Sequence, residues 1–340
     1  MRAATGGPLA APVGPRRRGA VCAVALALAA PWLSGCGATL DSPVPPDAPW
    51  NLVRYGPERT RLNYHDRWAD EKLTLLERMN RDREAHGAPP LEYEPRAAFV
   101  GDRYCLEMAL ARSTGHWDPT GRAPYVRWGL AGGVDYHSQN AVAFSHDAAS
   151  DDQPLLDRLL EAHASMMAEQ PPHDGHRRLI LDPTMTHVGI GAAAVGGQFR
   201  MSQEFTRVLL EWVEVPDRPL HAGSIAALAA QPLPGWRVAE VEVRWEPPLP
   251  EAATGVVHRS GGYGYPEVVR RLSPEPPRGT AHVGGAEPGF PVGDDGRFTL
   301  RFELNQGPGY YFVVCLLRAW PAVDQSELLR ASAALVVAVP

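Results

Sequence analysis

The sequence contains very little lysine and cysteine and has no excess of basic charge. Lys72 is the only lysine among 340 residues, and 33 basic residues stand against 39 acidic ones, for a formal net charge of −6. This balance argues against a nucleic-acid binder with a strong overall basic field. Long apolar runs are scarce too: the N-terminal apolar stretch, residues 20–33, falls short of the roughly 20 residues that a membrane-spanning helix needs.

Signature motifs of several enzyme classes are also missing. The sequence has no HExxH, no Walker A loop and no GxSxG. Residues 189–194 (GIGAAA) fit a loose dinucleotide fingerprint. That fingerprint requires a following helix, whereas Gly196 and Gly197 predict a hairpin turn between two strands. Residues 261–266 (GGYGYP) are compatible with a ligand loop, but we favour a surface connection between strands.

The N-terminus has the pattern of an export signal. Three arginines, at positions 16–18, precede the apolar stretch, which ends in Leu33-Ser34-Gly35-Cys36. This ending resembles a bacterial lipobox, in which the cysteine thiol receives a diacylglycerol. We therefore expect a lipoprotein signal peptide at residues 1–35 and a protein anchored to the bacterial cell envelope through Cys36. The alternative is an ordinary signal peptide that happens to contain a cysteine.

Cysteine usage predicts no disulfide framework. Cys22 lies in the expected signal peptide and Cys36 is the expected lipidation site, which leaves Cys105 and Cys315. Each has apolar neighbours, Cys105 in a helical pattern and Cys315 in a strand pattern. Two buried free thiols are therefore favoured over a bridge between them.

Periodicity divides the rest of the chain into two domains. Helical patterns cover residues 67–86, 95–113, 121–130 and 154–169, and two strands follow at 186–194 and 199–206. Residues 36–66 are expected to be a stiff proline-containing tether, 67–214 the first domain and 215–235 a linker. Residues 236–340 contain only strand patterns and predict a small β-sandwich. The expected fold class is α+β.

Four segments of the first domain resemble one family. They are residues 76–83 (LERMNRDR), 115–122 (GHWDPTGR), 138–142 (SQNAV) and 174–191, which begins DGHRRLILDP and ends THVGIG. In this order they resemble the CAP superfamily, which includes cysteine-rich secretory, antigen-five and plant pathogenesis-related proteins. Residues 202–205 (SQEF) are similar to the family's TQVF strand. The resemblance covers about residues 70–207 and implies an α-β-α sandwich (the SCP-like domain).

The resemblance also implies a cleft lined by two histidines and two glutamates. His116 and His176 match the histidine positions. Gln139 stands where the family's GENIA motif has its glutamate, which is a departure from the pattern. Glu169 is our choice for the second acid, with Glu161 as the alternative. Two imidazoles and carboxylates suit a metal such as Zn²⁺, so His116 and His176 are candidate metal ligands. The amide at position 139 removes one anionic ligand and one candidate base.

These features favour a non-enzymatic binding module. Its ligand would be a small amphiphile, such as a lipid, or a component of the envelope, held in the cleft of His116, Gln139, Glu169 and His176. The first alternative is a metal-dependent hydrolase in which His116 and His176 hold the metal and Glu169 is the base. The second is a structural envelope protein whose C-terminal sandwich makes contacts.

Overall fold

The computed structural model describes residues 40–41, 66, 68–145, 153–216, 218–248, 261–276, 287–321 and 329–340. Residues 38–340 form one compact unit. The expected signal peptide at residues 1–35 and the expected lipidation site, Cys36, lie outside the described residues. Within the described ranges, no helix has the length and apolar character needed to cross a bilayer.

The N-terminal half of this unit is built on one five-stranded sheet. Its strand order is β1 (Leu40–Asp41), β4 (His187–Val195), β5 (Gln198–Arg207) and β3 (Tyr136–Ser145), and β2 (Glu92–Tyr93) pairs with β4. The Gly196-Gly197 turn joins β4 to β5 as a hairpin, as predicted. Strand β3 was not expected from the sequence, and it ends this strand order at one edge of the sheet.

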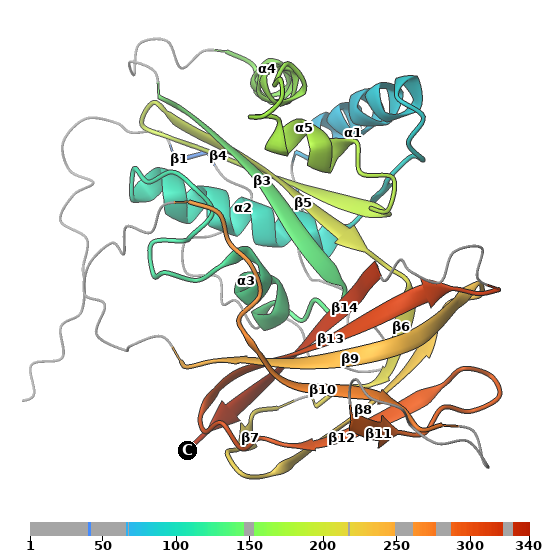
Figure 1. Ribbon diagram of the computed structural model, residues 1–340. Helices are drawn as coiled ribbons and strands as arrows, with labels where there is room; N and C mark the ends of the chain where they lie inside the picture. The colour runs from blue at the N-terminus through green and yellow to red at the C-terminus, as the bar shows by residue number, and fades with distance from the viewer. Residues whose placement is uncertain are drawn as a thin grey trace, which may run out of the picture. The chain divides into compact units, whose positions relative to one another are not determined.

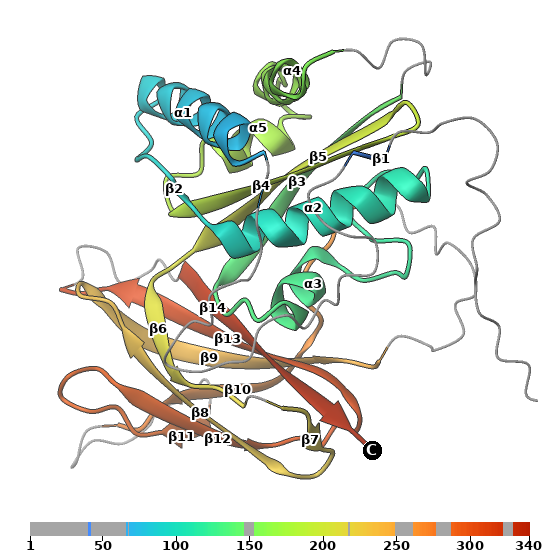
Figure 2. The ribbon, with the colours of Figure 1, turned by 180° about the vertical axis from the view of Figure 1, so that it is seen from behind.

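Helices cover both faces of this sheet. Figures 1 and 2 show α1 (Ala69–Ala85), α4 (Leu155–Met167) and α5 (Gly175–Ile180) on one face, with α2 (Pro95–Leu110) and α3 (Pro124–Leu130) on the other. The expected α-β-α sandwich is therefore confirmed. The four predicted helices agree with α1, α2, α3 and α4 to within a few residues.

Helix α2 lies unusually close to strand β4. It begins at Pro95, where the missing backbone N–H costs no helical hydrogen bond, and the Glu94 side chain accepts a hydrogen bond from the Arg96 N–H at 3.1 Å. Farther along, Gly101 faces Gly191, and a Cβ added to Gly191 would lie 2.1 Å from the Gly101 carbonyl carbon. Small residues at both positions therefore set the distance between helix and sheet.

The only lysine of the chain connects α1, α2 and β4. Lys72 Nζ lies 2.6 Å from Asp102 Oδ2 and 2.6 Å from Asp66 Oδ2, and both Lys72 and Asp102 are fully buried. Asp102 Oδ1 also accepts a hydrogen bond from the Ala192 N–H at 2.8 Å. Each buried charge thus has a partner, which is the condition for burying charge at all.

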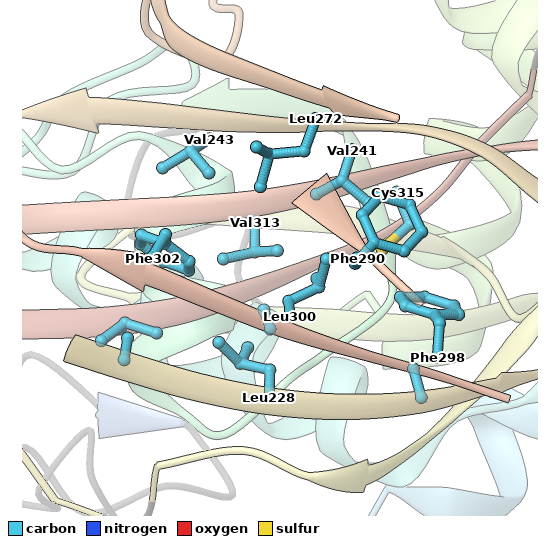
Figure 3. Packing of buried hydrophobic residues seen from close by; sticks show 14 of the residues in the cluster. Leu228, Val241, Val243, Leu272, Phe290, Phe298, Leu300, Phe302, Val313 and Cys315 are labelled. Atoms are coloured by element: carbon cyan, nitrogen blue, oxygen red, sulfur yellow. The ribbon is translucent and has the colours of Figure 1, made fainter. Parts of the chain in front are cut away.

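The C-terminal half is a sandwich of two sheets, as expected, but it begins at residue 210, inside the range predicted for the first domain, and not at residue 236. The larger sheet has six strands in the order β11 (Glu287–Phe290), β10 (Val268–Pro274), β9 (Trp236–Glu246), β13 (Gly309–Ala319), β14 (Leu329–Val339) and β7 (Leu220–His221). The smaller sheet has three strands in the order β12 (Phe298–Glu303), β8 (Ile225–Pro232) and β6 (Leu210–Glu214). Figure 3 shows the core between them, in which Leu228 and Leu300 face Val241 and Val313.

Two expectations about connecting segments were wrong. Residues 215–235, predicted to be a linker, contain β7 and the whole of β8, the central strand of the smaller sheet. The alanines of β8 are small and not β-branched, so they gave no strand signal. The predicted tether, residues 36–66, contains β1, which pairs with β4 through Leu40 and Val195. The rest of that segment is outside the described residues, apart from Asp66.

The two halves share a hydrophobic core. Tyr125 and Val126 of α3 pack against Phe312 and Leu335 of β13 and β14. The contact is close enough that a Cβ on Gly129 would lie 2.7 Å from the Leu335 side chain. This packing fixes the C-terminal sheet against the edge of the N-terminal half, where β3 lies.

Candidate functional site

A cavity of about 610 Å³ lies along the edge strand β3. Its size falls in the range typical of small-molecule sites. The four residues singled out from the sequence all border it, and so does the segment 262–265 of the C-terminal half. The lining consists of His116, Tyr125, Tyr136, His137, Ser138, Gln139, Asn140, Glu169, His173, Gly175, His176, Leu179, Gly262, Tyr263, Gly264 and Tyr265.

His116 is held on one side of the cavity by the loop between α2 and α3. The buried Arg127 donates hydrogen bonds to the carbonyls of His116 at 3.0 Å and Arg122 at 2.7 Å, which fixes the path of this loop. The His116 Nδ1 lies 3.0 Å from Gln139 Oε1. Burial lowers the pKa of His116, and the Gln139 contact only partly opposes this effect, so the neutral imidazole is favoured.

His176 is held on the other side of the cavity by Glu169. Glu169 follows α4, and its carboxylate accepts a hydrogen bond from the His176 backbone N–H at 3.0 Å and another from the ring Nδ1. Asn140 Nδ2 donates to the His176 carbonyl at 3.0 Å and ties this turn to β3. Burial acts to raise the pKa of Glu169, but its hydrogen bonds with His176 outweigh burial and leave that pKa below its usual value.

An acidic residue that was not predicted to be part of the site lies behind the cavity. Glu204 lies on β5 directly opposite Gln139 on β3, and its side chain is completely buried. Gln139 Nε2 donates to Glu204 Oε1 at 2.7 Å, and His137 Nε2 lies 2.9 Å from Glu204 Oε2. Burial acts to raise the pKa of Glu204, yet the contacts with His137 and Gln139 and the charge of Arg127 hold it below the usual value. Strand β5 (QFRMSQEFTR) is mostly polar, so no local signal distinguished this glutamate.

The segment 261–266 is a strand connection, as favoured, but it also borders the cavity. Tyr263 Oη accepts a hydrogen bond from the Gln139 N–H at 2.5 Å, and its ring lies edge-on to His116 with 4.9 Å between centroids. Tyr265 stacks on Tyr125 with 4.7 Å between centroids. Burial raises the pKa of Tyr263 to about 12, so its hydroxyl stays neutral. Both halves of the chain therefore contribute to the cavity wall.

The other candidate residues lie as follows. Glu161 is exposed on α4 and does not border the cavity, so Glu169 is the acid beside His176. His137 contacts Glu204, and His163 contacts Asp82. Cys105 and Cys315 are buried free thiols, as predicted.

The donor set does not fit a metal ion bound by protein ligands alone. Among the described residues, no group of three or more histidine, cysteine, aspartate or glutamate side chains could hold an ion. A protein zinc site uses at least three such ligands. Here Glu169 already accepts hydrogen bonds from His176, and an amide stands at position 139. We therefore derive no catalytic step through a metal.

Comparison with solved structures finds distant similarities. An outer surface protein from Borrelia burgdorferi is 12% identical with a TM-score of 0.33, covering 42% of this chain and 96% of its own. An extracellular protein with an SCP domain from Bacillus anthracis is 19% identical with a TM-score of 0.33 and covers 45% of this chain. A cysteine-rich secretory protein from Staphylococcus aureus is 16% identical with a TM-score of 0.29 and covers 44% of this chain. This chain spans 44% of the length of each of the latter two.

Comparison with curated proteins finds no match. The model of the CAP family, described as the cysteine-rich secretory protein family, matches residues 76–205. This range contains all four motifs, nearly all of the sheet, and His116, Gln139, Glu169 and His176. Residues 76–205 are therefore a CAP domain, the domain of the cysteine-rich secretory protein family.

Proposed function

We propose that this protein binds a small envelope component, specifically a sugar-containing fragment, in the cavity beside β3. The observation that carries the proposal is the chemistry of the lining. Only one of the sixteen lining residues, Leu179, is aliphatic, whereas four are tyrosines and the others include amides, imidazoles and a serine. An acyl chain would find few aliphatic partners there. A sugar ring presents hydroxyls to polar groups and C–H surfaces to aromatic rings, which suits this lining.

Charge also favours an uncharged ligand on the His116 side of the cavity. The neutral amide of Gln139 faces the cavity, and the carboxylate of Glu204 lies behind it, out of contact with solvent. Burial keeps the neighbouring Tyr263 hydroxyl un-ionised. Among the described lining residues, Glu169 is the one carboxylate that a cationic ligand could meet; it lies on the other side of the cavity and is already engaged by His176.

Calorimetric titration tests the ligand class. The full chain is titrated with a trisaccharide of N-acetylglucosamine and, in parallel, with dodecylphosphocholine below its micelle concentration. We expect saturable heat with the trisaccharide only, and its loss in the Tyr263→Ala variant, because that ring forms part of the wall. Leu110→Ala is the control, since Leu110 is exposed outside the cavity. Binding of the amphiphile alone would refute the sugar ligand, and binding of neither would refute the binding function.

We further propose that the protein is exported and lipid-anchored through Cys36. The support is the order of the three arginines, the apolar stretch and the Leu33-Ser34-Gly35-Cys36 sequence. Cells grown with radiolabelled palmitate should incorporate label into the wild type, and the protein should partition with membranes. Cys36→Ser should lose both properties, while Cys22→Ser should keep them. Labelling of Cys36→Ser at the wild-type level would contradict the anchor.

A further inference from the structure

The buried acid Glu204 lies at the centre of a chain of side chains that ends at the cleft. Gln139 and Glu204 are direct partners in the antiparallel pairing of β3 with β5, so their side chains emerge on the same face of the sheet. The chain runs from Glu204 Oε1 to Gln139 Nε2 at 2.7 Å, and from Gln139 Oε1 to His116 Nδ1 at 3.0 Å. Only His116, at its end, belongs to the α2–α3 loop.

The chemistry of these three side chains fixes which atom donates and which accepts in each hydrogen bond. A buried carboxylate only accepts hydrogen bonds, so it must face the NH₂ group of the Gln139 amide. The amide oxygen then faces His116, and because that oxygen can only accept, His116 Nδ1 must carry the proton. In a neutral imidazole the other nitrogen, Nε2, then carries a lone pair. His116 Nε2 makes no hydrogen bond to another described residue, and the ring borders the cavity.

Glu204 is itself fixed in place. Its second oxygen lies 2.9 Å from His137 Nε2, and His137 stacks on Trp128 of α3 with 5.3 Å between centroids and 13° between ring planes. Both Glu204 and His137 have fully buried side chains. Tyr263 Oη accepts a hydrogen bond from the Gln139 backbone N–H at 2.5 Å, which holds this residue of β3 against the segment 261–266. Glu204 is therefore in contact with both His137 and Gln139, and it accepts its hydrogen bond from Gln139.

We infer that Glu204 is a positioning residue, which orients the Gln139 amide and thereby holds His116 in the Nδ1–H tautomer, with Nε2 as an acceptor facing the cleft. The carboxylate that the resemblance implied at position 139 is thus supplied from position 204 on the neighbouring strand. A ligand hydroxyl would donate to His116 Nε2. The inference concerns the cleft of the proposed function, but it is tested without ligand, so the failure of one is distinguishable from the failure of the other.

Nitrogen NMR of the full chain labelled with ¹⁵N-histidine tests the inference, because the two tautomers have distinct ring-nitrogen shifts. The His116 signals are assigned by their loss in His116→Asn. We expect the Nδ1–H pattern in the wild type. In Glu204→Gln the amide of Gln139 is free to rotate, and the His116 pattern should shift to a mixture of tautomers or to the Nε2–H form.

Two further variants separate positioning from a general loss of structure. Glu169→Gln removes the carboxylate beside His176 and should leave the His116 pattern unchanged. The double variant Gln139→Glu/Glu204→Gln exchanges amide and acid, so that a carboxylate accepts directly from His116 Nδ1; it should restore the Nδ1–H pattern. An Nε2–H pattern in the wild type, no change in folded Glu204→Gln, or no restoration in the double variant would overturn the inference.

Discussion

The two imidazoles of the cleft are held by different partners. His176 contacts the carboxylate of Glu169 directly, whereas His116 contacts the amide of Gln139, behind which lies the buried Glu204. The first ring is therefore next to a negative charge, and the second is separated from its nearest one by a neutral group. The cleft presents two chemically distinct sides to a ligand.

The buried His163, outside the cleft, gives the fold a predictable dependence on pH. His163 lies on α4, and its Nε2 atom is 2.9 Å from Oδ2 of Asp82 on α1. The Nδ1 atom of His163 is 3.2 Å from Gln203 Nε2. Burial lowers the pKa of His163 below the usual value for a histidine despite the contact with Asp82. The unfolded chain therefore binds this proton more readily than the native state, and acidification favours unfolding.

We expect the free energy of unfolding to fall as the pH decreases through about 6.5, and to fall again below about 4. The second decrease arises in part because the pKa of Asp82 is also lowered: burial opposes this shift, but Arg78 and His163 outweigh it. Urea denaturation from about pH 8 to about pH 5 measures the first decrease. His163→Asn should flatten that part of the curve, and an equally steep curve in this variant would contradict the assignment.

Among the elements, the contact of α2 with β4 tolerates the least change. Gly191→Ala would place a Cβ 2.1 Å from the Gly101 carbonyl carbon, which is backbone and cannot rotate away. We expect a loss of roughly 1–3 kcal/mol or more in the free energy of unfolding, because overpacking forces backbone shifts. Gly175→Ala is the matched control, since its added Cβ would meet nothing within 4 Å. Equal denaturation midpoints for the two variants would contradict this account.

The elements also differ in how well the sequence predicted them. Helix α2 was predicted because a proline marks its start and apolar residues recur at helical spacing. Strand β3 was not, because it carries His137, Gln139 and Asn140, polar residues that are buried through partners on other elements. Residues 138–142 were still located through the family resemblance, which does not depend on local propensity.

The missed parts of the site depend on contacts that are distant in sequence. Glu204 meets Gln139 across 65 residues, and Tyr263 meets Gln139 across 124. Periodicity describes local geometry and does not indicate which strand lies beside which. The resemblance paired His116 with His176, but it ends near residue 207 and says nothing of the segment 261–266. The family resemblance therefore could not predict that the C-terminal half contributes to the cleft.

At the scale of the whole molecule, the shared core makes the C-terminal sandwich part of the site. Phe312 of β13 is fully buried and contacts Tyr125 of α3 and Tyr265, with ring centroids 5.0 and 5.8 Å away. These two tyrosines also border the cavity. The position of the sandwich thus determines the position of the cavity wall.

Phe312→Ala tests this coupling. The substitution should cost about 3–5 kcal/mol, as is typical for a buried phenylalanine, and it should accelerate amide exchange in α3 as well as in β13. Phe298→Ala is the control, because Phe298 packs in the core between the two C-terminal sheets. It should accelerate exchange in the sandwich only. Unchanged exchange in α3 of the Phe312→Ala variant would show that the halves are not coupled.

The central claim is that one ligand occupies a cavity built by both halves of the chain. Hydrogen–deuterium exchange of the full chain, with and without the N-acetylglucosamine trisaccharide, tests it most directly. The account predicts new protection in two segments together, 136–140 of β3 and 261–266 of the C-terminal half. Protection confined to one of these segments, protection elsewhere, or none at saturating trisaccharide would contradict it.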